Sequence, residues 1–209
     1  MNNRGALIVI EGCDCSGKSI QCRNVVESLN NRGIPAEAVR FPDRTTETGH
    51  IIDKYLKNST DLPDQVIHLI FSANRWELRS KMEKLLMNGT TLVVDRYSFS
   101  GVAYSSAKKN GMDIEWYKSP ERGLLKPDLV LFLKLEPNVI KQRKGFGEER
   151  YETLEFQEAV FKSFELLTDD TWKIVDADTS VDKLTENLVS EVVPVVDRVK
   201  GLPLSNLWS

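Results

Sequence analysis

Continuous apolar runs alternate with amphipathic stretches along this chain. Residues 6–10 and 129–135 are almost wholly apolar and residues 91–94 have the same buried-strand character, as strands buried on both faces of a parallel sheet do, and residues 36–41 and 172–175 form weaker runs. Between these runs, a three-to-four-residue apolar period predicts helices over residues 18–32, 49–56, from about 62 onward, 80–88, from 137, 156–167 and 181–192. The alternation predicts an α/β fold, a parallel sheet with helices on both faces, in one domain over residues 1–209.

The helix that begins near residue 62 has two notable faces. Its predicted core face consists of Val66, Leu69, Ile70 and Ala73. Phe71 and Arg75 lie four residues apart on a second face, so that an aromatic ring and a guanidinium stand one turn from each other. On the pattern alone, a solvated arginine beside a partly buried phenylalanine is the simpler interpretation of this pair.

The charge of the chain is close to balanced. The 28 Lys and Arg residues face 31 Asp and Glu residues, a net charge of −3, so no global basic field favours nucleic acid or an anionic membrane. No apolar run approaches the roughly 18 residues of a membrane span, and no apolar signal segment precedes the first strand. We therefore expect a cytoplasmic protein, with nuclear or mitochondrial pools left open, and neither a nucleic-acid nor a membrane partner.

Three cysteines, Cys13, Cys15 and Cys22, lie close together in the sequence. The first two are too close for an unstrained disulfide, and neither His50 nor His68 lies near enough in sequence to complete a zinc set. We expect reduced thiols in a reducing compartment, with Cys22 packed on the apolar face of the first helix.

A phosphate-binding loop follows the first apolar run. Residues 12–19 read Gly-Cys-Asp-Cys-Ser-Gly-Lys-Ser and fit the spacing G-x-x-x-x-G-K-[ST], between a predicted strand and a predicted helix. Backbone N–H groups of such a loop bind phosphates, Lys18 reaches the β- and γ-phosphates, and the Ser19 hydroxyl binds Mg²⁺. The predicted ATP-binding residues are Gly12, Cys13, Asp14, Cys15, Ser16, Gly17, Lys18 and Ser19.

Two further strands end in polar residues at the same edge of the predicted sheet. The second strand runs into Phe41-Pro42-Asp43-Arg44, where a cis Phe41–Pro42 bond would make a tight bend before Arg44. The strand over 91–94 is followed by Asp95 and Arg96, a carboxylate and a guanidinium directed at the ligand edge. Asp95 is a predicted ligand of Mg²⁺, partly through water.

A charged, glycine-punctuated segment covers about residues 141–152. Such a segment cannot be core, and a solvated loop is the simplest interpretation. Its basic residues also suit a mobile lid that closes over phosphates; they are Lys141, Arg143, Lys144 and Arg150.

Taken together, four ordered motifs resemble those of the thymidylate kinases of the eukaryotic and poxviral kind. They are residues 12–19, Phe41-Pro42-Asp43-Arg44, Phe71-Ser72-Ala73-Asn74-Arg75-Trp76 and Asp95-Arg96-Tyr97, and the likeness continues through residues 4–9, 100–104, 126–129 and the Leu207-Trp208 ending. The resemblance implies a P-loop nucleoside-monophosphate kinase fold with a short lid. It also implies a homodimer that transfers the γ-phosphate of ATP to dTMP, giving dTDP and ADP, with Mg²⁺ as cofactor.

The resemblance also implies roles for individual residues. Arg44, Arg75 and Arg96 would neutralise the acceptor phosphate, which needs no strong general base because it is already an anionic nucleophile. Phe71 would stack on thymine, and Asp14 would lie near the 3′-hydroxyl and the acceptor phosphate. The other residues expected around the nucleotide are Phe41, Ser100, Gly101, Tyr104, Tyr151 and Gln157. The catalytic set would comprise Lys18, Asp14, Asp95, Arg96 and Arg143.

One position departs from the family pattern. Many eukaryotic members carry a basic residue directly after the loop aspartate, where this chain has Cys15. An arginine there could stabilise the transferring phosphoryl group, so we expect Arg143 of the lid, with Lys144 and Arg150 nearby, to supply that cation. We further expect the loop N–H groups and Lys18 to favour the Cys15 thiolate and make it sensitive to oxidants.

Two other functions fit part of the sequence. A deoxynucleoside kinase shares the fold and the phosphate loop, but its neutral hydroxyl acceptor needs a carboxylate base rather than three phosphate-facing arginines. A nucleotide-binding protein without efficient catalysis is supported by Cys15 alone. A regulatory GTPase is excluded, because the sequence has no Asn-Lys-x-Asp guanine-reading tetrapeptide.

Overall fold

The computed structural model describes residues 3–136, 139–140, 147 and 149–209. Its centre is a five-stranded parallel sheet in the order β2-β3-β1-β4-β5. The strands are β1 (Leu7–Glu11), β2 (Ala36–Arg40), β3 (Thr91–Asp95), β4 (Leu129–Lys134) and β5 (Trp172–Asp176). The predicted α/β class is confirmed, and all five strands lie where the apolar runs place them.

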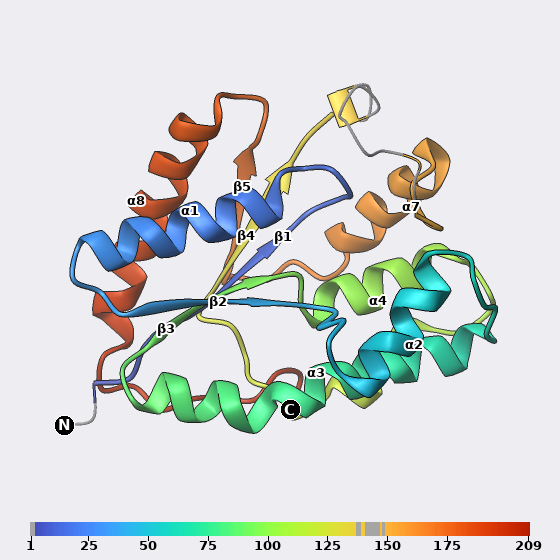
Figure 1. Cartoon of the computed structure of the whole chain (residues 1–209), viewed down its shortest axis with the longest axis horizontal. Helices are drawn as coiled ribbons and strands as arrows, with labels where there is room; N and C mark the ends of the chain where they lie inside the picture. Colours follow the sequence, from blue (N-terminus) through green and yellow to red (C-terminus); the bar gives the residue numbers. More distant parts are fainter. Residues whose placement is uncertain (1–2, 137–138, 141–146, 148) are drawn as a thin grey trace.

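Helices cover both faces of the sheet (Figure 1). Helices α1 (Lys18–Asn31) and α8 (Val181–Val199) pack together on one face, and α3 (Asp64–Met87) and α4 (Ser98–Ala107) lie on the other. The remaining described elements are α2 (Glu47–Leu56), α5 (Ile114–Lys118), the 3₁₀ turn η1 (Ser119–Glu121) and α7 (Leu154–Glu165). Among the described helices, none is long and apolar enough to cross a membrane.

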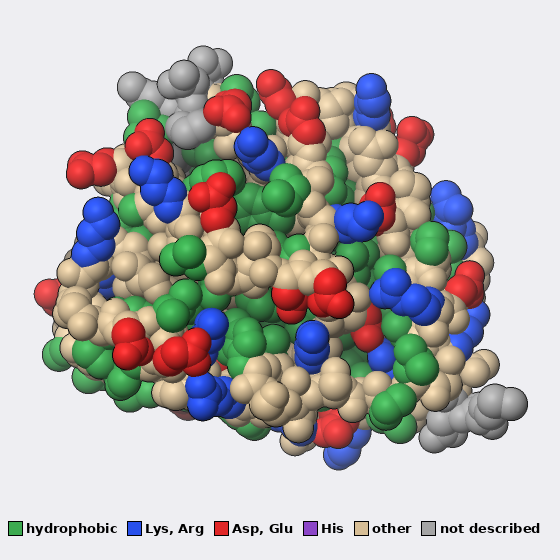
Figure 2. Space-filling model, turned by 180° about the vertical axis from the view of Figure 1, so that it is seen from behind, with side chains coloured by type: hydrophobic (Ala, Val, Ile, Leu, Met, Phe, Trp, Pro, Cys, Tyr) green, Lys and Arg blue, Asp and Glu red, His purple; other side chains and the backbone are tan. Residues whose placement is uncertain are grey.

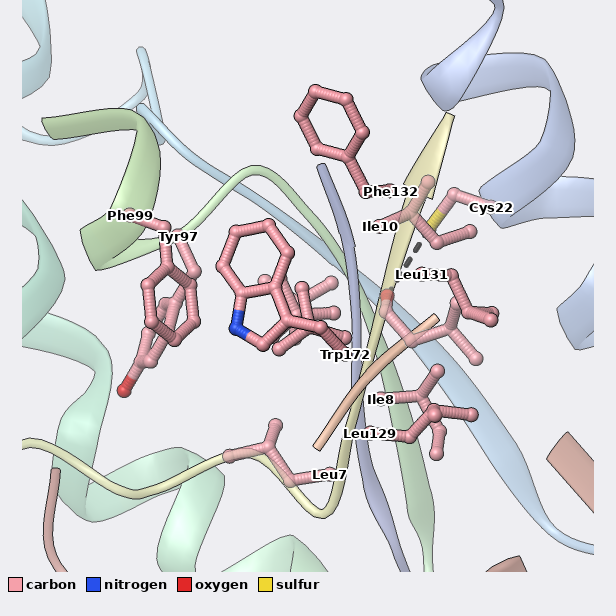
Figure 3. Packing of buried hydrophobic residues seen from close by; sticks show 14 of the residues in the cluster. Leu7, Ile8, Ile10, Cys22, Tyr97, Phe99, Leu129, Leu131, Phe132 and Trp172 are labelled. Atoms are coloured by element: carbon pink, nitrogen blue, oxygen red, sulfur yellow. Dashed lines mark hydrogen bonds between the residues drawn. The ribbon is translucent and has the colours of Figure 1, made fainter. Parts of the chain in front are cut away.

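The central strands are buried on both sides, as their apolar runs require. Figure 3 shows Ile8 and Ile10 of β1 on the α1 side of the sheet and Tyr97, Phe99 and Trp172 on the other side. The thiol of Cys22 donates a hydrogen bond to the backbone oxygen of Val93 (3.1 Å), so this cysteine packs in the core as expected. Burial raises the pKa of the Cys22 thiol to about 12.

The region after Leu62 differs from the prediction in two ways. The two helices expected there are one continuous 24-residue helix, α3. The expected core face is also wrong, because Val66 and Leu69 are 41% and 47% exposed and Ala73 is exposed as well. The buried face of α3 carries Ile67, His68, Ser72, Asn74, Arg75, Met82 and Leu86 instead. Most of the polar members are held by distant partners, which no local periodicity shows.

Candidate active site

A cavity of about 670 Å³ opens at the carboxyl ends of the parallel strands, where ligands of open α/β sheets bind. Its wall comes from the phosphate loop, the loop after β2, helices α3 and α4, and the segment around residue 150. The predicted site residues that line it are Asp14, Cys15, Gly17, Lys18, Ser19, Phe41, Arg44, Phe71, Arg75, Asp95, Arg96, Ser100, Gly101, Tyr104 and Tyr151. The sequence motifs therefore converge on one cavity.

The phosphate loop joins the end of β1 to the start of α1. Gly12 has φ +147°, and a Cβ there would lie 2.8 Å from the backbone oxygen of Leu133, so only glycine fits without a shift of the backbone. Gly17 takes φ +94° at the N-cap of α1. The ammonium of Lys18 folds back over the loop and donates to the backbone oxygen of Cys13 and to Ser16 Oγ (3.1 Å). The Lys18 ammonium is thus held by groups of the phosphate loop itself.

Lys18 is buried, and this changes its titration. Burial, together with the positive charge of Arg96, lowers the pKa of Lys18 from its ordinary 10.5 to about 8. A bound triphosphate would supply the negative charge that favours the protonated form. The ammonium and the polyanion are therefore expected to stabilise each other.

Ser19 and Asp95 meet at the start of α1. The Ser19 hydroxyl donates a short hydrogen bond to Asp95 Oδ2, and Arg40 Nε lies 3.7 Å from the same carboxylate oxygen. A hydroxyl and a carboxylate are hard oxygen ligands of the kind that Mg²⁺ takes, so this pair fits the metal. Among the described residues, no three His, Cys, Asp or Glu side chains cluster as a metal site. This agrees with the usual binding of Mg²⁺ in kinases, where one or two protein side chains hold the ion together with the phosphates of the nucleotide.

Asp14 is the centre of a hydrogen-bond network over the cavity. Its carboxylate accepts hydrogen bonds from Arg96 Nη2, from the Tyr104 hydroxyl (2.9 Å) and from Gln157 Nε2 (2.6 Å). The Asp14 N–H in turn donates to Gln157 Oε1 (2.8 Å), so Gln157 of α7 contacts the loop on two sides. Although burial opposes ionisation, the Arg96 and Lys18 charges hold the pKa of Asp14 below its ordinary value.

Glu11 is a residue of this region that the sequence interpretation missed. It is fully buried, and its carboxylate accepts from the backbone N–H groups of Tyr97 (2.9 Å) and Ser100 (3.0 Å) and from the Ser100 hydroxyl (2.6 Å). Helix α4 has no side-chain cap of its own at Tyr97, so Glu11 caps it from β1. Burial raises the pKa of Glu11. The only signal for this role was an acidic residue between an apolar strand and the loop glycine.

Arg75 forms a buried ion pair with Glu121 of η1. The two side chains are 3% and 0% exposed, and Arg75 donates through Nε to Glu121 Oε2 (2.8 Å) and through Nη2 to Oε1. Gly101 lies against the guanidinium, since a Cβ there would come within 2.5 Å of Nη2. Glu121, which the sequence interpretation also missed, already neutralises the charge of Arg75. Arg44 and Arg96 are paired with carboxylates as well, so the distinguishing feature of Arg75 is that its ion pair is almost completely buried.

Arg44 and Arg150 hold the segment after residue 148 against α2. Arg44 pairs with Asp53 (2.8 Å) and Glu149 (2.7 Å), and its Nε is buried without a hydrogen-bond partner among the described residues. Arg150 donates to the backbone oxygen of Tyr55 in the last turn of α2 and to that of Thr60 in the loop that follows (both 3.0 Å). Arg150 therefore has a structural position that argues against a share in phosphoryl transfer.

The expected lid falls largely outside the described residues. Arg143, Lys144 and Lys141 lie there, so the assignment of Arg143 as the catalytic cation stays a prediction. The Phe41–Pro42 peptide bond before Arg44 is cis, as predicted.

The expected Cys15 thiolate is contradicted. Burial and the negative charges of Glu152 and Asp14 raise the pKa of the Cys15 thiol, and Lys18 and Arg96 do not outweigh them. Cys13 is buried, with its pKa raised to about 11 by the same kind of desolvation. Neutral thiols in the loop are poor targets for oxidants at neutral pH.

Comparisons with known proteins agree with the geometry. The family model for thymidylate kinase matches residues 10–188. The chain is 53% identical over 210 residues to a thymidylate kinase of Arabidopsis thaliana, covering 99% of this chain and 78% of the relative. It is 46% identical over 208 residues to a thymidylate kinase of Homo sapiens, covering 98% of each protein.

A solved structure gives the same result for the fold. A thymidylate kinase from Candida albicans superposes with a TM-score of 0.90 at 38% identity, over 99% of this chain and 100% of the other. The family model matches most of the chain, and the identity to the relatives extends over nearly the full length of this chain. The chain belongs to the thymidylate kinase family.

Proposed function

We propose that this chain transfers the γ-phosphate of ATP to dTMP, giving dTDP and ADP, in the cavity at the carboxyl ends of β1 and β3. Membership of the family supports the reaction. The observation that carries the assignment to this cavity is the convergence of the phosphate loop, Arg96 and Phe71 on one space of nucleotide size. We also propose that residues 1–209 form one catalytic domain.

ATP is proposed to bind at the phosphate loop, residues 12–19. The backbone N–H groups of the loop and the N-terminus of α1 would hold the β-phosphate, and Lys18 would contact the β- and γ-phosphates. Ser19 and Asp95 would hold Mg²⁺, Asp95 partly through water. When bound, the ion neutralises charge on the transferring phosphate and orients it.

The acceptor phosphate is proposed to lie between Arg44 and Arg96. Arg96 already points at the loop, since Nη1 lies 3.4 Å from the backbone oxygen of Gly12 and Nη2 contacts Asp14. Arg44 has a buried Nε that is free to donate. Two guanidiniums would reduce the repulsion between the two polyanions and align the acceptor oxygen for in-line attack.

The base is proposed to lie on Phe71, beside Arg75. Because the ion pair of Arg75 with Glu121 is almost completely buried, we propose that this guanidinium donates to a neutral carbonyl oxygen of the base rather than to the phosphate. Tyr104, Tyr151 and Gln157 would surround the sugar with Asp14. This modifies the role expected for Arg75 and keeps it in the substrate-binding set.

A homodimer is also part of the proposal. Val66, Leu69 and Trp76 are 41%, 47% and 39% exposed, and with Ala73 they form an apolar stripe along α3. An exposed apolar stripe on a helix is typical of an association surface. Sedimentation of the chain at micromolar concentration tests this, and a monomer at all concentrations would contradict it.

The partners are proposed to be the small molecules ATP and dTMP, without nucleic acid or membrane. Figure 2 shows Lys and Arg side chains interspersed with Asp and Glu on one face, with no broad patch of a single sign there. All three cysteines are free. A cytoplasmic location fits them, and nuclear or mitochondrial pools stay open.

Asp14 bears on the alternative of a deoxynucleoside kinase. A hydroxyl acceptor would need a carboxylate base, but Asp14 is held by Arg96 and its pKa is lowered, which makes it a weak base. Comparing ADP release with dTMP, with thymidine and with ATP alone tests the proposal. Turnover of thymidine but not dTMP would favour the nucleoside kinase, and turnover of neither would favour a binding protein without efficient catalysis.

A further inference from the structure

Arg96 lies in a turn between β3 and α4 that has a strained backbone conformation. Its φ is +66°, in the left-handed region that residues with a Cβ rarely adopt, so neighbouring groups must hold the turn in place. The N–H of Arg96 donates to the backbone oxygen of Ile10 (3.1 Å), and the N–H of Tyr97 donates to Glu11 Oε1 (2.9 Å). Two consecutive residues of β1 therefore hold two consecutive N–H groups of the turn.

Glu11 cannot act on a ligand directly. It is 0% exposed, and it is not among the described residues that line the cavity. Besides the Tyr97 N–H, its carboxylate accepts from the N–H (3.0 Å) and from the hydroxyl (2.6 Å) of Ser100. Ser100 and Arg96 both line the cavity. Any effect of Glu11 on a bound nucleotide must therefore pass through neighbours such as these two residues.

The Ser100 hydroxyl connects Glu11 to the Arg96 side chain. Arg96 Nη1 lies 3.2 Å from Ser100 Oγ, and because a guanidinium can only donate, Ser100 accepts this bond. The single proton of the Ser100 hydroxyl goes to Glu11 Oε2. The other contacts of Nη1 are longer, at 3.4 Å to the backbone oxygen of Gly12 and 3.3 Å to the Tyr104 hydroxyl. Ser100 is therefore the nearest of the oxygens that hold Nη1.

We propose that Glu11 is a positioning residue, which acts through the Ser100 hydroxyl and the turn before α4 to hold the Arg96 guanidinium in the orientation that binds the acceptor phosphate. The inference rests on the proposed function, in which Arg96 contacts that phosphate. Asp14 holds Nη2 and Ser100 holds Nη1, so the plane of the guanidinium is fixed at two nitrogens. A guanidinium fixed before binding loses less conformational freedom when the phosphate arrives. Glu11 should therefore affect the contribution of the phosphate to affinity and leave that of the nucleoside unchanged.

The test measures the Kd of dTMP and of thymidine by titration calorimetry, because the ratio of the two values reports what the phosphate contributes. Ser100→Ala removes the oxygen that holds Nη1. It should weaken dTMP binding about tenfold and change thymidine binding by less than about twofold. Ser98→Ala is the matched control and should change neither value, because Ser98 is a buried serine of the same helical turn whose Oγ has no hydrogen-bond partner among the described residues.

Glu11→Gln tests the carboxylate itself. The amide oxygen can still accept from the two backbone N–H groups, but the NH₂ group donates toward Ser100 Oγ, so the Ser100 proton loses its acceptor. We expect the same loss of about tenfold for dTMP and little change for thymidine. The double variant Glu11→Gln/Ser100→Ala should bind dTMP within about threefold of either single variant, because all three proteins have lost one and the same connection.

Three results would overturn the inference. They are equal losses for dTMP and thymidine, which indicate a purely structural role, additive losses in the double variant, and a loss confined to Ser100→Ala, which would mean that Ser100 acts on the ligand without Glu11. Should Glu11→Gln unfold, Ser100→Ala decides, since it keeps Glu11 and both backbone hydrogen bonds, and an unchanged ratio in it would overturn the inference.

The same experiment separates this inference from the proposed function. A wild type that binds dTMP more tightly than thymidine but releases no ADP would count against the proposed function alone, and the Kd ratios of the variants would still decide the inference. A wild type that binds both equally would overturn the inference as well, because Arg96 would then hold no acceptor phosphate.

Discussion

Arg75 and Glu121 form a bidentate ion pair in which both side chains are almost completely excluded from solvent. The pair joins α3 to η1, 46 residues further along the chain. It holds the guanidinium against Gly101 at the edge of the cavity. Because Glu121 neutralises the Arg75 guanidinium and fixes its position, we expect Arg75 to bind a ligand through directed hydrogen bonds more than through net charge.

Loss of the carboxylate should therefore destabilise the fold. Glu121→Gln leaves the Arg75 guanidinium buried without a counter-charge, and we expect the free energy of unfolding to fall by about 3–5 kcal/mol. Urea unfolding followed by circular dichroism measures this. The matched control is Glu115→Gln, because Glu115 pairs with Lys118 and Arg122 at the surface and should change stability little. Equal effects of the two variants would contradict the buried-pair interpretation.

Loss of Arg75 should affect the kinetics with dTMP and not those with ATP. Arg75→Ala is expected to lower kcat/KM for dTMP at least about tenfold, because a hydrogen bond in a desolvated site is lost, while KM for ATP stays nearly constant. The double variant Arg75→Ala/Glu121→Gln removes the stranded carboxylate and serves as the folding control. Steady-state kinetics with each substrate varied in turn provide the measurement. Similar effects on dTMP and ATP in the double variant would refute the assignment.

ATP binding should take up protons in mildly alkaline solution. The pKa of Lys18 is about 8 in the free protein, below its ordinary 10.5, so above pH 8 the amine is increasingly neutral. The bound phosphates favour the ammonium and raise its pKa, so binding at about pH 9 requires proton uptake. Titration calorimetry in buffers of different ionisation enthalpy detects it. Lys18→Arg stays charged throughout and should lack this uptake; an identical proton count in both proteins would rule out Lys18 as its source.

Cys15 stands where many family members carry a basic residue, and Arg143 of the lid is predicted to supply the missing positive charge. Arg143→Ala should lower kcat about a hundredfold or more and leave dTMP affinity nearly unchanged, the signature of a contact made mainly in the transition state. Cys15→Arg should keep or raise kcat and should weaken the effect of Arg143→Ala, since two guanidiniums serving one phosphoryl group are not additive. Single-turnover rates of the wild type, the two single variants and the double variant form a double-mutant cycle. Additive effects would mean that the two positions have unrelated roles.

The strands and the phosphate loop were predictable because their signals are local. Both kinds of signal can be recognised from neighbouring residues alone, as in the apolar run over residues 91–94 and the motif over residues 12–19. The cis bond before Pro42 was predicted from its place between a strand end and Arg44.

Helix α3 shows where local pattern fails. Its buried face includes Asn74, whose side chain donates to the backbone oxygen of Asp43 (3.0 Å) and accepts from the Asp43 N–H (2.8 Å). Those partners belong to a loop 31 residues earlier, so burial of a polar side chain was decided by tertiary contacts. Glu11 and Glu121 were missed for the same reason, because each is satisfied by groups distant in the sequence. The apolar periodicity of α3 instead reflects its exposed stripe, which includes Val66 and Leu69.

Phosphorylation of dTMP in the cavity can be measured directly. The most direct measurement is ADP release, in a coupled assay with ATP and Mg²⁺, across dTMP, dUMP, dCMP, dGMP and thymidine, with Arg96→Ala as the inactive control. We expect the highest kcat/KM for dTMP, negligible release with thymidine, and loss of dTMP-dependent release in Arg96→Ala. Release that does not depend on dTMP, or that persists undiminished in Arg96→Ala, would contradict it.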